Sequence, residues 1–269
     1  MAAVDWPPLD PDRLEALGLP LIGRNVQVWN RIASTNDAAL QAARTPANAG
    51  LVVLAEEQSA GRGQRGRAWL APPRASILMS VVLFPPESLA APAALVSLTA
   101  VAVAVALERF VPGPLGIKWP NDIYAGGRKV GGILVERAAL GNSAEAVGTV
   151  IGIGLNVHAA PPDSDDLRAT ALDTLAGHRL DRTDLVCAVL TELDAWYRLS
   201  SEKGLPGLLS EWRKRACLVG ETIRVDTTEG SITGTLISID PLDGITLRTD
   251  SGLALSLAPT DIKQIRGQS

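Results

Sequence analysis

The feature of this chain that most constrains its fold is an uncharged run of nineteen residues from Leu89 to Leu107, LAAPAALVSLTAVAVAVAL. A run of this length either spans a bilayer or forms a helix that is buried on all sides. Pro92 stands near its start, Ala contributes little to membrane insertion, and no other segment of the sequence resembles a span. We therefore expect a buried helix and no membrane partner.

The composition permits such an enclosed core. The chain has 269 residues, of which 46% are hydrophobic, and this length suits one large domain, alone or with a small satellite. Its 25 basic and 29 acidic residues give a net charge of -4, so it lacks the basic surface that binds a phosphate backbone, and we expect no nucleic-acid partner. Cys187 and Cys217 stand far apart without a Cys or His cluster, so we predict neither a disulfide framework nor metal-ligating residues.

The N-terminal segment has no predicted domain of its own. It lacks the basic and apolar regions of a secretory signal, which favours a cytoplasmic protein. Residues 1–24 contain four prolines and one short helical candidate at 12–17, and this pattern is typical of a loose lead-in.

Strand and helix patterns mix along the next part of the chain. Ser34 to Asp37 supplies side chains suited to an N-cap, directly before an Ala-rich helix. The expected strands are 26–29, 51–55, 76–84, 130–136 and 146–157, and the expected helices are 38–43, 89–107, 184–199 and 205–215. This mixture predicts an α+β domain over residues 25–216, with a mixed sheet and helices on one face.

The pattern of apolar and polar residues changes again after residue 216. Short segments at 223–225, 232–239, 245–247 and 253–257 alternate apolar with polar residues, and Asp243-Gly244 is a hairpin signal between two of them. We predict a small all-β domain over residues 217–269, of the SH3-like barrel kind.

The densest chemical signal is the loop from Gln58 to Arg67. It follows a strand and holds three glycines and three arginines, namely Gly61, Gly63, Gly66, Arg62, Arg65 and Arg67. Glycines let backbone N–H groups approach an anion, and arginine forks bind carboxylate or phosphate. The same glycines fit a dinucleotide fingerprint, but Pro72-Pro73 and a further strand leave no room for the helix that this fingerprint needs. A solvated basic loop would explain the arginines but not the regular glycines.

Three further segments place polar groups at strand ends. Lys118-Trp-Pro-Asn-Asp122 brings a cation, an amide and a carboxylate to a turn, although Asn and Asp after Pro are also ordinary turn residues. Arg128 to Glu136 carries Lys129 at the start of a strand with paired glycines, which allow a ligand to lie against backbone. In Val150 to Val157, glycines alternate along a strand that ends near Asn156, which core packing alone does not explain.

Taken in order, these segments resemble the biotin protein ligase family across almost the whole chain. The matching segments are Ser34 to Asn36, Gln58 with Gly61 to Arg67, Lys118 to Asp122, Arg128 to Glu136, Gly152 to Val157 and the C-terminal β-domain. The resemblance implies a catalytic domain of the class II synthetase/biotin ligase type. It also implies a ligase that uses ATP, with Mg²⁺, to convert biotin to biotinyl-5'-adenylate and transfers biotin to a lysine of a biotin carboxyl carrier protein.

The resemblance also implies roles for individual residues. Biotin would be bound by Ser34, Thr35, Asn36, Gln58, Arg62, Gly63, Gln64 and Lys129. ATP or the adenylate would be bound by Arg65, Arg67, Trp69, Lys118, Asn121 and Asn156. The residues expected to carry the chemistry are Lys118, Lys129, Arg62 and Asp122, with Asp122 orienting or deprotonating the incoming lysine.

Two departures from the family pattern stand out. Many members carry Arg where this chain has Gln64, so a cation is missing from the loop that closes over the ligand. Members that repress transcription have an N-terminal helix-turn-helix domain of about sixty residues, whereas only thirty-three residues precede Ser34, so we expect the form without it.

Two other functions compete with this interpretation. A lipoate protein ligase shares the fold and the adenylate chemistry, but the arginine-glycine loop and Lys118 to Asp122 favour biotin. A biotin-sensing repressor is opposed by the net charge of -4 and by the missing helix-turn-helix region. The carrier protein and the oligomeric state, for which a homodimer is one option, do not follow from the sequence.

Overall fold

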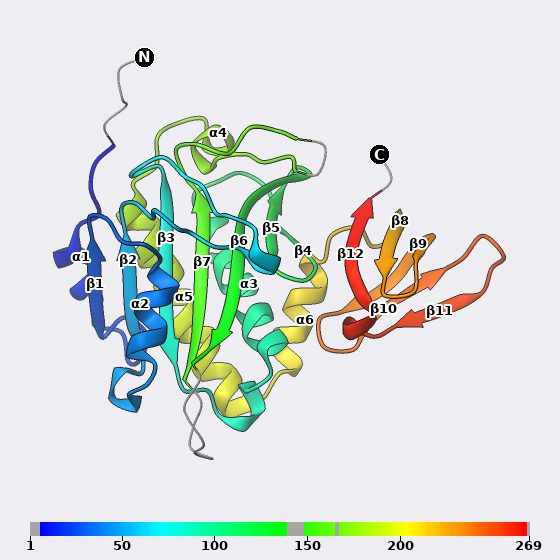
Figure 1. Ribbon diagram of the computed structural model, residues 1–269, viewed down its shortest axis with the longest axis horizontal. Helices are drawn as coiled ribbons and strands as arrows, with labels where there is room; N and C mark the ends of the chain where they lie inside the picture. Colours follow the sequence, from blue (N-terminus) through cyan, green and yellow to red (C-terminus); the bar gives the residue numbers. More distant parts are fainter. Residues whose placement is uncertain (1–5, 139–147, 165–166, 268–269) are drawn as a thin grey trace.

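The computed structural model describes residues 6–138, 148–164 and 167–267. They form a large mixed sheet with helices and a small second sheet (Figure 1). The large sheet has seven strands in the spatial order β1-β2-β3-β7-β6-β5-β4. The bounds are β1 (Asn25–Trp29), β2 (Leu51–Ala55), β3 (Ser76–Leu83), β4 (Gly116–Lys118), β5 (Asp122–Ala125), β6 (Arg128–Arg137) and β7 (Thr149–Asn156).

The strand pairing confirms the predicted mixed sheet. β1 and β2 run parallel, and all other neighbours are antiparallel. The sequence analysis did not predict β5, a strand of four residues that begins directly after the turn of the Lys-Trp-Pro-Asn-Asp segment. Residues 146 and 147, the start of one predicted strand, lie outside the described residues.

The uncharged run forms the buried helix α3 (Pro92–Leu107), which confirms that prediction. It begins three residues later than expected, because Glu87–Leu89 form a separate 3-10 turn. Thirteen of its sixteen residues are buried, and its two hydroxyls are satisfied locally: Ser97 donates to the carbonyl of Ala93 and Thr99 to that of Leu95. Within the described ranges, no helix is long and apolar enough to cross a membrane.

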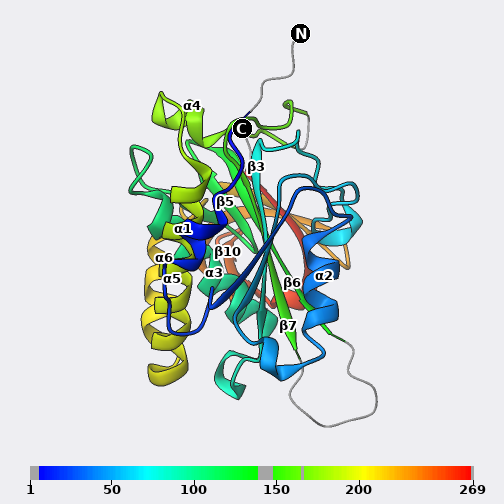
Figure 2. The same cartoon turned by 90° about the vertical axis from the view of Figure 1, so that its left-hand side faces the viewer.

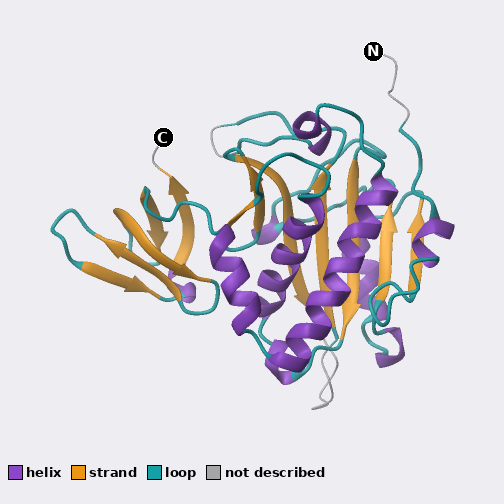
Figure 3. Ribbon diagram, turned by 180° about the vertical axis from the view of Figure 1, so that it is seen from behind, coloured by secondary structure: helices purple, strands orange, loops and turns teal. Residues whose placement is uncertain are grey.

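The long helices form one layer on the face of the sheet that is turned toward the viewer in Figure 3. α3 packs against β6 on one side and against α5 (Arg182–Lys203) and α6 (Pro206–Arg215) on the other. A short helix, α4 (Leu172–Ala176), follows the loop after β7. This layer agrees with the prediction of helices on one face.

The opposite face of the sheet carries the short helix α2 (Thr35–Ala42), as Figure 2 shows. It lies across β2, β3 and β7, where Ala39 and Ala43 pack on Val53, Val82 and Val150 in a second, smaller core. Small alanines let this helix approach the sheet closely. Its N-terminus therefore stays near the sheet, in the space that also holds the predicted site residues.

Residues 6–24 are packed against the domain rather than loose. α1 (Pro11–Glu15) buries Leu14 completely and contacts β1 and α5. Arg182 at the start of α5 forms an ion pair of 2.6 Å with Glu56, and these side chains are 2% and 4% exposed. Arg182 also donates to the carbonyl of Pro7, and Glu56 accepts from the backbone N–H of Leu9.

The C-terminal part forms an antiparallel sheet of five strands in the order β11-β10-β9-β8-β12. Register shifts between β9 and β10 and between β8 and β12 bend it, as bulges do in barrels. The strands are β8 (Thr222–Thr227), β9 (Ser231–Asp240), β10 (Gly244–Arg248), β11 (Ala254–Leu257) and β12 (Ile262–Gly267). The sequence analysis did not predict β12, whose apolar residues are interrupted by Lys263, Gln264 and Arg266.

The buried pair yields a stability prediction. Arg182→Met leaves the Glu56 carboxylate buried without a counter-ion, and we expect a loss of about 3–5 kcal/mol in the free energy of unfolding. Urea unfolding followed by circular dichroism measures it. As a control, Arg13→Met breaks only exposed ion pairs with Asp181 and Asp184, so its unfolding midpoint should stay almost unchanged. An equal loss of unfolding free energy in the two variants would contradict a special role for the buried Arg182–Glu56 pair.

Candidate functional site

A cavity of about 500 Å³ opens on the α2 face of the large sheet. Every site residue predicted from the sequence lines it. They are Ser34, Thr35, Asn36, Gln58, Arg62, Gly63, Gln64, Arg65, Arg67, Trp69, Lys118, Asn121, Asp122, Lys129 and Asn156. The fold therefore gathers five distant sequence segments around one space.

The first wall of the cavity is the start of α2. Ser34 is the N-cap residue, but its side chain makes no capping hydrogen bond. It is one of the residues that line the cavity. The backbone N–H and the hydroxyl of Thr35 donate to Gln58 Oε1 at 2.7 and 3.0 Å. The carbonyl oxygen of Gln58 therefore accepts both hydrogen bonds from Thr35, and its amide nitrogen can donate to another group.

Asn36 is held on both sides of its amide. Its Nδ2 donates to Glu136 Oε2 at 2.6 Å, and Ser80 Oγ lies 2.5 Å from its Oδ1. A Cβ atom on Gly152 would stand 2.3 Å from Asn36 Oδ1, so a larger residue there would displace this amide. The first of the alternating glycines of β7 thus makes room for a polar group of the cavity.

The second alternating glycine makes room for an aromatic ring. A Cβ atom on Gly154 would stand 2.7 Å from the indole of Trp69. Trp69 Nε1 is buried and has no hydrogen-bond partner among the described residues. The indole therefore packs flat on the backbone of β7 and forms an apolar wall of the cavity.

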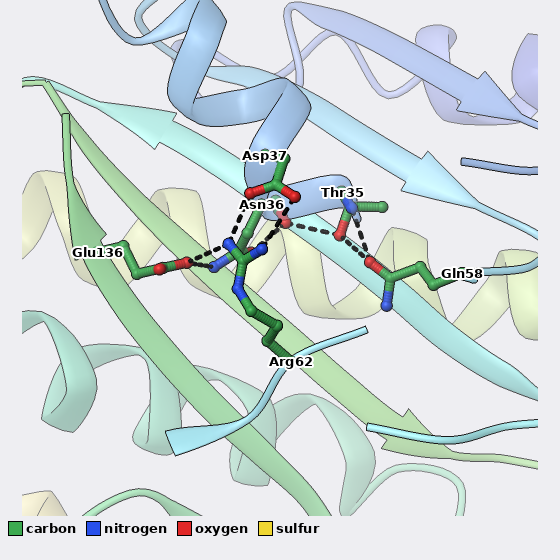
Figure 4. Close-up of polar contacts among 7 residues, drawn as sticks. Thr35, Asn36, Asp37, Gln58, Arg62 and Glu136 are labelled. Carbon is green, nitrogen blue, oxygen red and sulfur yellow. Dashed lines mark hydrogen bonds and ion pairs between the residues drawn. The ribbon is translucent and has the colours of Figure 1, made fainter. Parts of the chain in front are cut away.

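The arginine-glycine loop lines the cavity, and its residue Arg62 is held by ion pairs (Figure 4). Arg62 Nη1 and Nη2 donate to the two carboxylate oxygens of Asp37 at 2.9 and 2.6 Å, and Nη2 lies 3.5 Å from Glu136 Oε2. Hydrogen bonding to Asp37 raises the pKa of Arg62 above its usual value. Within the loop, η2 (Gln64–Gly66) holds Arg65 at a φ of 58°, a left-handed conformation that costs energy outside glycine.

Two lysines line the part of the cavity next to β4, β5 and β6. Lys129 Nζ lies 2.5 Å from Asp122 Oδ1 and 6.0 Å from the centre of the Trp69 ring. A Cβ atom on Gly132 would stand 3.3 Å from both charged atoms, so the glycine leaves space for this pair. Lys118 lies above the Tyr124 ring, 5.1 Å from its centre, and burial lowers its pKa while Asp122 opposes the shift.

The two asparagines anchor on backbone. Asn121 Nδ2 donates to the carbonyl of Ile133 at 2.8 Å, and Asn156 Nδ2 lies 3.4 Å from that of Thr170. Both amides are thereby oriented with one end fixed. Their remaining acceptor oxygens are the groups that a ligand N–H would use.

Several residues at the site were missed by sequence reasoning. Ser80 and Glu136 fix Asn36, and Lys263, Gln264 and Ile265 of β12 line the cavity from the C-terminal sheet. Ser80 is a polar residue within an otherwise almost wholly apolar strand, which is a usable signal. Nothing in the sequence of β12 indicated that it reaches the cavity.

Charge is unevenly distributed around the cavity. Among the described lining residues, six cations (Arg62, Arg65, Arg67, Lys118, Lys129 and Lys263) face one carboxylate, that of Asp122. The described residues contain no group of three or more His, Cys, Asp or Glu side chains that would hold a metal ion. The charges of the cavity's lining residues suit an anionic ligand.

Comparison with known proteins assigns the chain to a class. The sequence profile of the Biotin/lipoate A/B protein ligase family matches residues 28–156. Fold and site together therefore define a ligase domain of the biotin/lipoate class.

Individual relatives narrow the assignment. The Biotin--[acetyl-CoA-carboxylase] ligase of Mycobacterium tuberculosis is 36% identical over 83% of this chain and 84% of its own length. The bifunctional ligase/repressor BirA of Bacillus subtilis is 33% identical over 90% of this chain and 73% of its own. The structure of the biotin protein ligase from Aquifex aeolicus in complex with biotin and ATP gives a TM-score of 0.77 at 25% identity and covers 91% of this chain and 100% of that one. The chain belongs to the biotin protein ligase family.

Proposed function

We propose that this chain activates biotin with ATP to biotinyl-5'-adenylate and then transfers biotin to a specific lysine of a biotin carboxyl carrier protein. The observation that carries the proposal is that six cationic side chains and only one carboxylate, that of Asp122, are among the described residues that line a single cavity. The chain as a whole has a net charge of -4, so this cluster is a local concentration of positive charge. A carboxylate that must approach a triphosphate needs such a concentration.

In this proposal, biotin lies on the α2 side of the cavity. Ser34, Thr35, Asn36 and Gln58 offer donors and acceptors for the ureido ring, and Trp69 offers an apolar wall. The loop residues Arg62, Gly63 and Gln64 close over the ring. The carboxylate of biotin then points toward Lys129 at the other end of the space.

The nucleotide lies on the side of Asn121, Asn156 and Lys118, where Arg65, Arg67 and Lys118 face the phosphates. A biotin carboxylate oxygen attacks the α-phosphorus, the bond to the bridging oxygen breaks, and pyrophosphate leaves. Lys129 stabilises the charge that both anions bring together in the transition state. Mg²⁺ would neutralise the phosphates further, and Asp122 is the described lining carboxylate that would hold it, because Mg²⁺ binds through few carboxylates and substrate phosphates.

The second step needs a neutral amine. The carrier lysine attacks the acyl carbon, the bond between that carbon and the phosphate oxygen breaks, and AMP leaves. Asp122 lies beside Lys129 and accepts the proton or orients the amine. In this proposal, the protein works in the cytoplasm, with the carrier protein as its partner.

The whole proposal is tested by incubating the pure chain with labelled biotin, ATP, Mg²⁺ and a biotin carboxyl carrier domain. Label on the carrier lysine, dependent on ATP, is the expected result. A parallel reaction with lipoate and a lipoyl carrier domain, analysed by mass spectrometry, separates the two branches of the ligase class. Modification by lipoate alone would overturn the choice of biotin.

We predict that Lys129→Ala loses most of the adenylate-forming rate while the fold persists. Removing one electrostatic contact to the reacting groups typically costs roughly 10² to 10³ in rate. Biotin-dependent release of pyrophosphate measures this rate, and circular dichroism checks the fold. A rate within a few-fold of the wild type would remove Lys129 from the chemistry.

We predict that a chain truncated after Arg215 stays partly folded and biotinylates the carrier poorly. Residues 263–265 line the cavity, so the truncated chain lacks part of its wall. Lys263→Ala in the full chain is the matched variant, because it removes one cation of that wall and keeps the domain. Full carrier biotinylation by the truncated chain would show that the C-terminal sheet is dispensable.

We predict that Gln64 retains the adenylate less well than Arg would, since Arg offers a charged fork and Gln a neutral amide. A charged hydrogen bond is worth about 1.5–3 kcal/mol against about 1 for a neutral one, so retention should differ by up to roughly tenfold. Gln64→Arg should slow adenylate dissociation in a single-turnover chase and reduce stray labelling of other lysines. Unchanged dissociation would mean that position 64 makes no contact with the ligand.

A further inference from the structure

Glu136 occupies a position that the proposed function leaves without a role. It lies on β6, on the α2 face of the sheet, and its side chain is 30% exposed. Its Oε2 atom accepts from Asn36 Nδ2 at 2.6 Å and lies 3.5 Å from Arg62 Nη2 (Figure 4). One carboxylate thus contacts a residue of the cavity wall and a residue of the loop that covers the cavity.

The contact with Asn36 decides which way its amide points. A carboxylate accepts hydrogen bonds and donates none, so only the NH₂ end of the amide can face Glu136. The oxygen end must then face the hydroxyl of Ser80, which is fully buried and lies 2.5 Å away. Without Glu136, both orientations of the amide become accessible, and the cavity loses a fixed pattern of donors and acceptors.

Arg62, the second residue that Glu136 contacts, is also bound by another carboxylate. Asp37, in the first turn of α2, binds the same guanidinium through both of its oxygens, and its side chain is 50% exposed. The loop segment from Gly61 to Trp69 is closed on itself by the bond from Trp69 N to Gly61 O, so holding Arg62 holds the segment. Arg62 therefore ties the loop to α2 and β6 through protein groups, independently of position 64.

We propose that Glu136, with Asp37, is a positioning pair for the biotin side of the cavity: Glu136 fixes the amide of Asn36, and both carboxylates hold the loop closed through Arg62. This inference rests on the proposed function, because it specifies how that site recognises and retains its acid substrate. Neither carboxylate lines the cavity, so both act through Asn36 and Arg62.

The test uses Asp37→Asn and Glu136→Gln in the full chain, since both keep shape and remove charge. The matched control is Asp184→Asn, which also removes a half-exposed carboxylate paired with an arginine in the first turn of a helix, but on α5. Calorimetric titration with biotin in the absence of ATP is the first measurement. Steady-state kinetics in biotin and in ATP, with a chase for adenylate release, are the second.

We expect Glu136→Gln to raise the dissociation constant and the KM for biotin by roughly tenfold, because a charged hydrogen bond to Asn36 becomes a neutral one. Asp37→Asn should raise both by about two- to fivefold and speed adenylate release, with a smaller effect at high salt. The KM for ATP and the rate at saturating biotin should stay within about twofold of the wild type, as a role limited to positioning requires.

A double-mutant cycle isolates the loop anchor. In an Arg62→Gln background, Asp37→Asn should have no further effect on biotin binding, because its partner is already gone. If the effects of Arg62→Gln and Asp37→Asn on biotin binding were additive, Asp37 would not hold the loop through Arg62. If both carboxylate variants bound biotin as the wild type does, the whole inference would be overturned. If Glu136→Gln does not fold, the exposed Asp37→Asn and its cycle decide the loop anchor. A wild-type chain that binds no biotin would instead overturn the proposed function itself.

Discussion

The enclosure of α3 is the constraint on which the rest of the structure depends. A sixteen-residue helix without a charged side chain is stable only when a sheet covers one side and other helices cover the remainder. β6 provides the first cover, and α5 and α6 provide the second. This arrangement commits one entire face of the sheet to the main core. The cavity can therefore form only on the opposite face, where the small helix α2 leaves space.

On that face, electrostatic repulsion is built into the site. Lys118 and Lys129 both lie near Asp122, and the charge of Lys129 contributes to lowering the pKa of Lys118. Holding cations together in a partly buried space costs free energy in the absence of an anion. An anionic ligand relieves this repulsion, so part of the ligand's binding free energy comes from the site's own unfavourable charge arrangement. The charge of Arg62 is balanced in the same way by the carboxylates of Asp37 and Glu136.

The sequence predicted the strands of the catalytic domain well, because periodicity and turn residues are local signals. The resemblance to a known family also predicted fifteen residues that line the cavity. The sequence did not predict β5 or β12, which are too short or too polar to show a period, nor the side of the sheet on which α2 lies. The sequence analysis missed the roles of Ser80 and Glu136, because each depends on Asn36, which is 44 or 100 residues away in the sequence. Such pairing has no local signature. The roles of the individual side chains remain predictions.

The alternation along β7 has a consequence for the accuracy of folding. Ile151, Ile153 and Leu155 face the core around α3, while Gly152 and Gly154 face Asn36 and Trp69. A slip of this strand by one residue relative to β3 and β6 would exchange the two sets. Bulky side chains would then fill the cavity, and glycines would leave voids beside α3. A mispaired chain would therefore be both unstable and inactive, so quality control that detects instability would also remove the copies that cannot bind ligand.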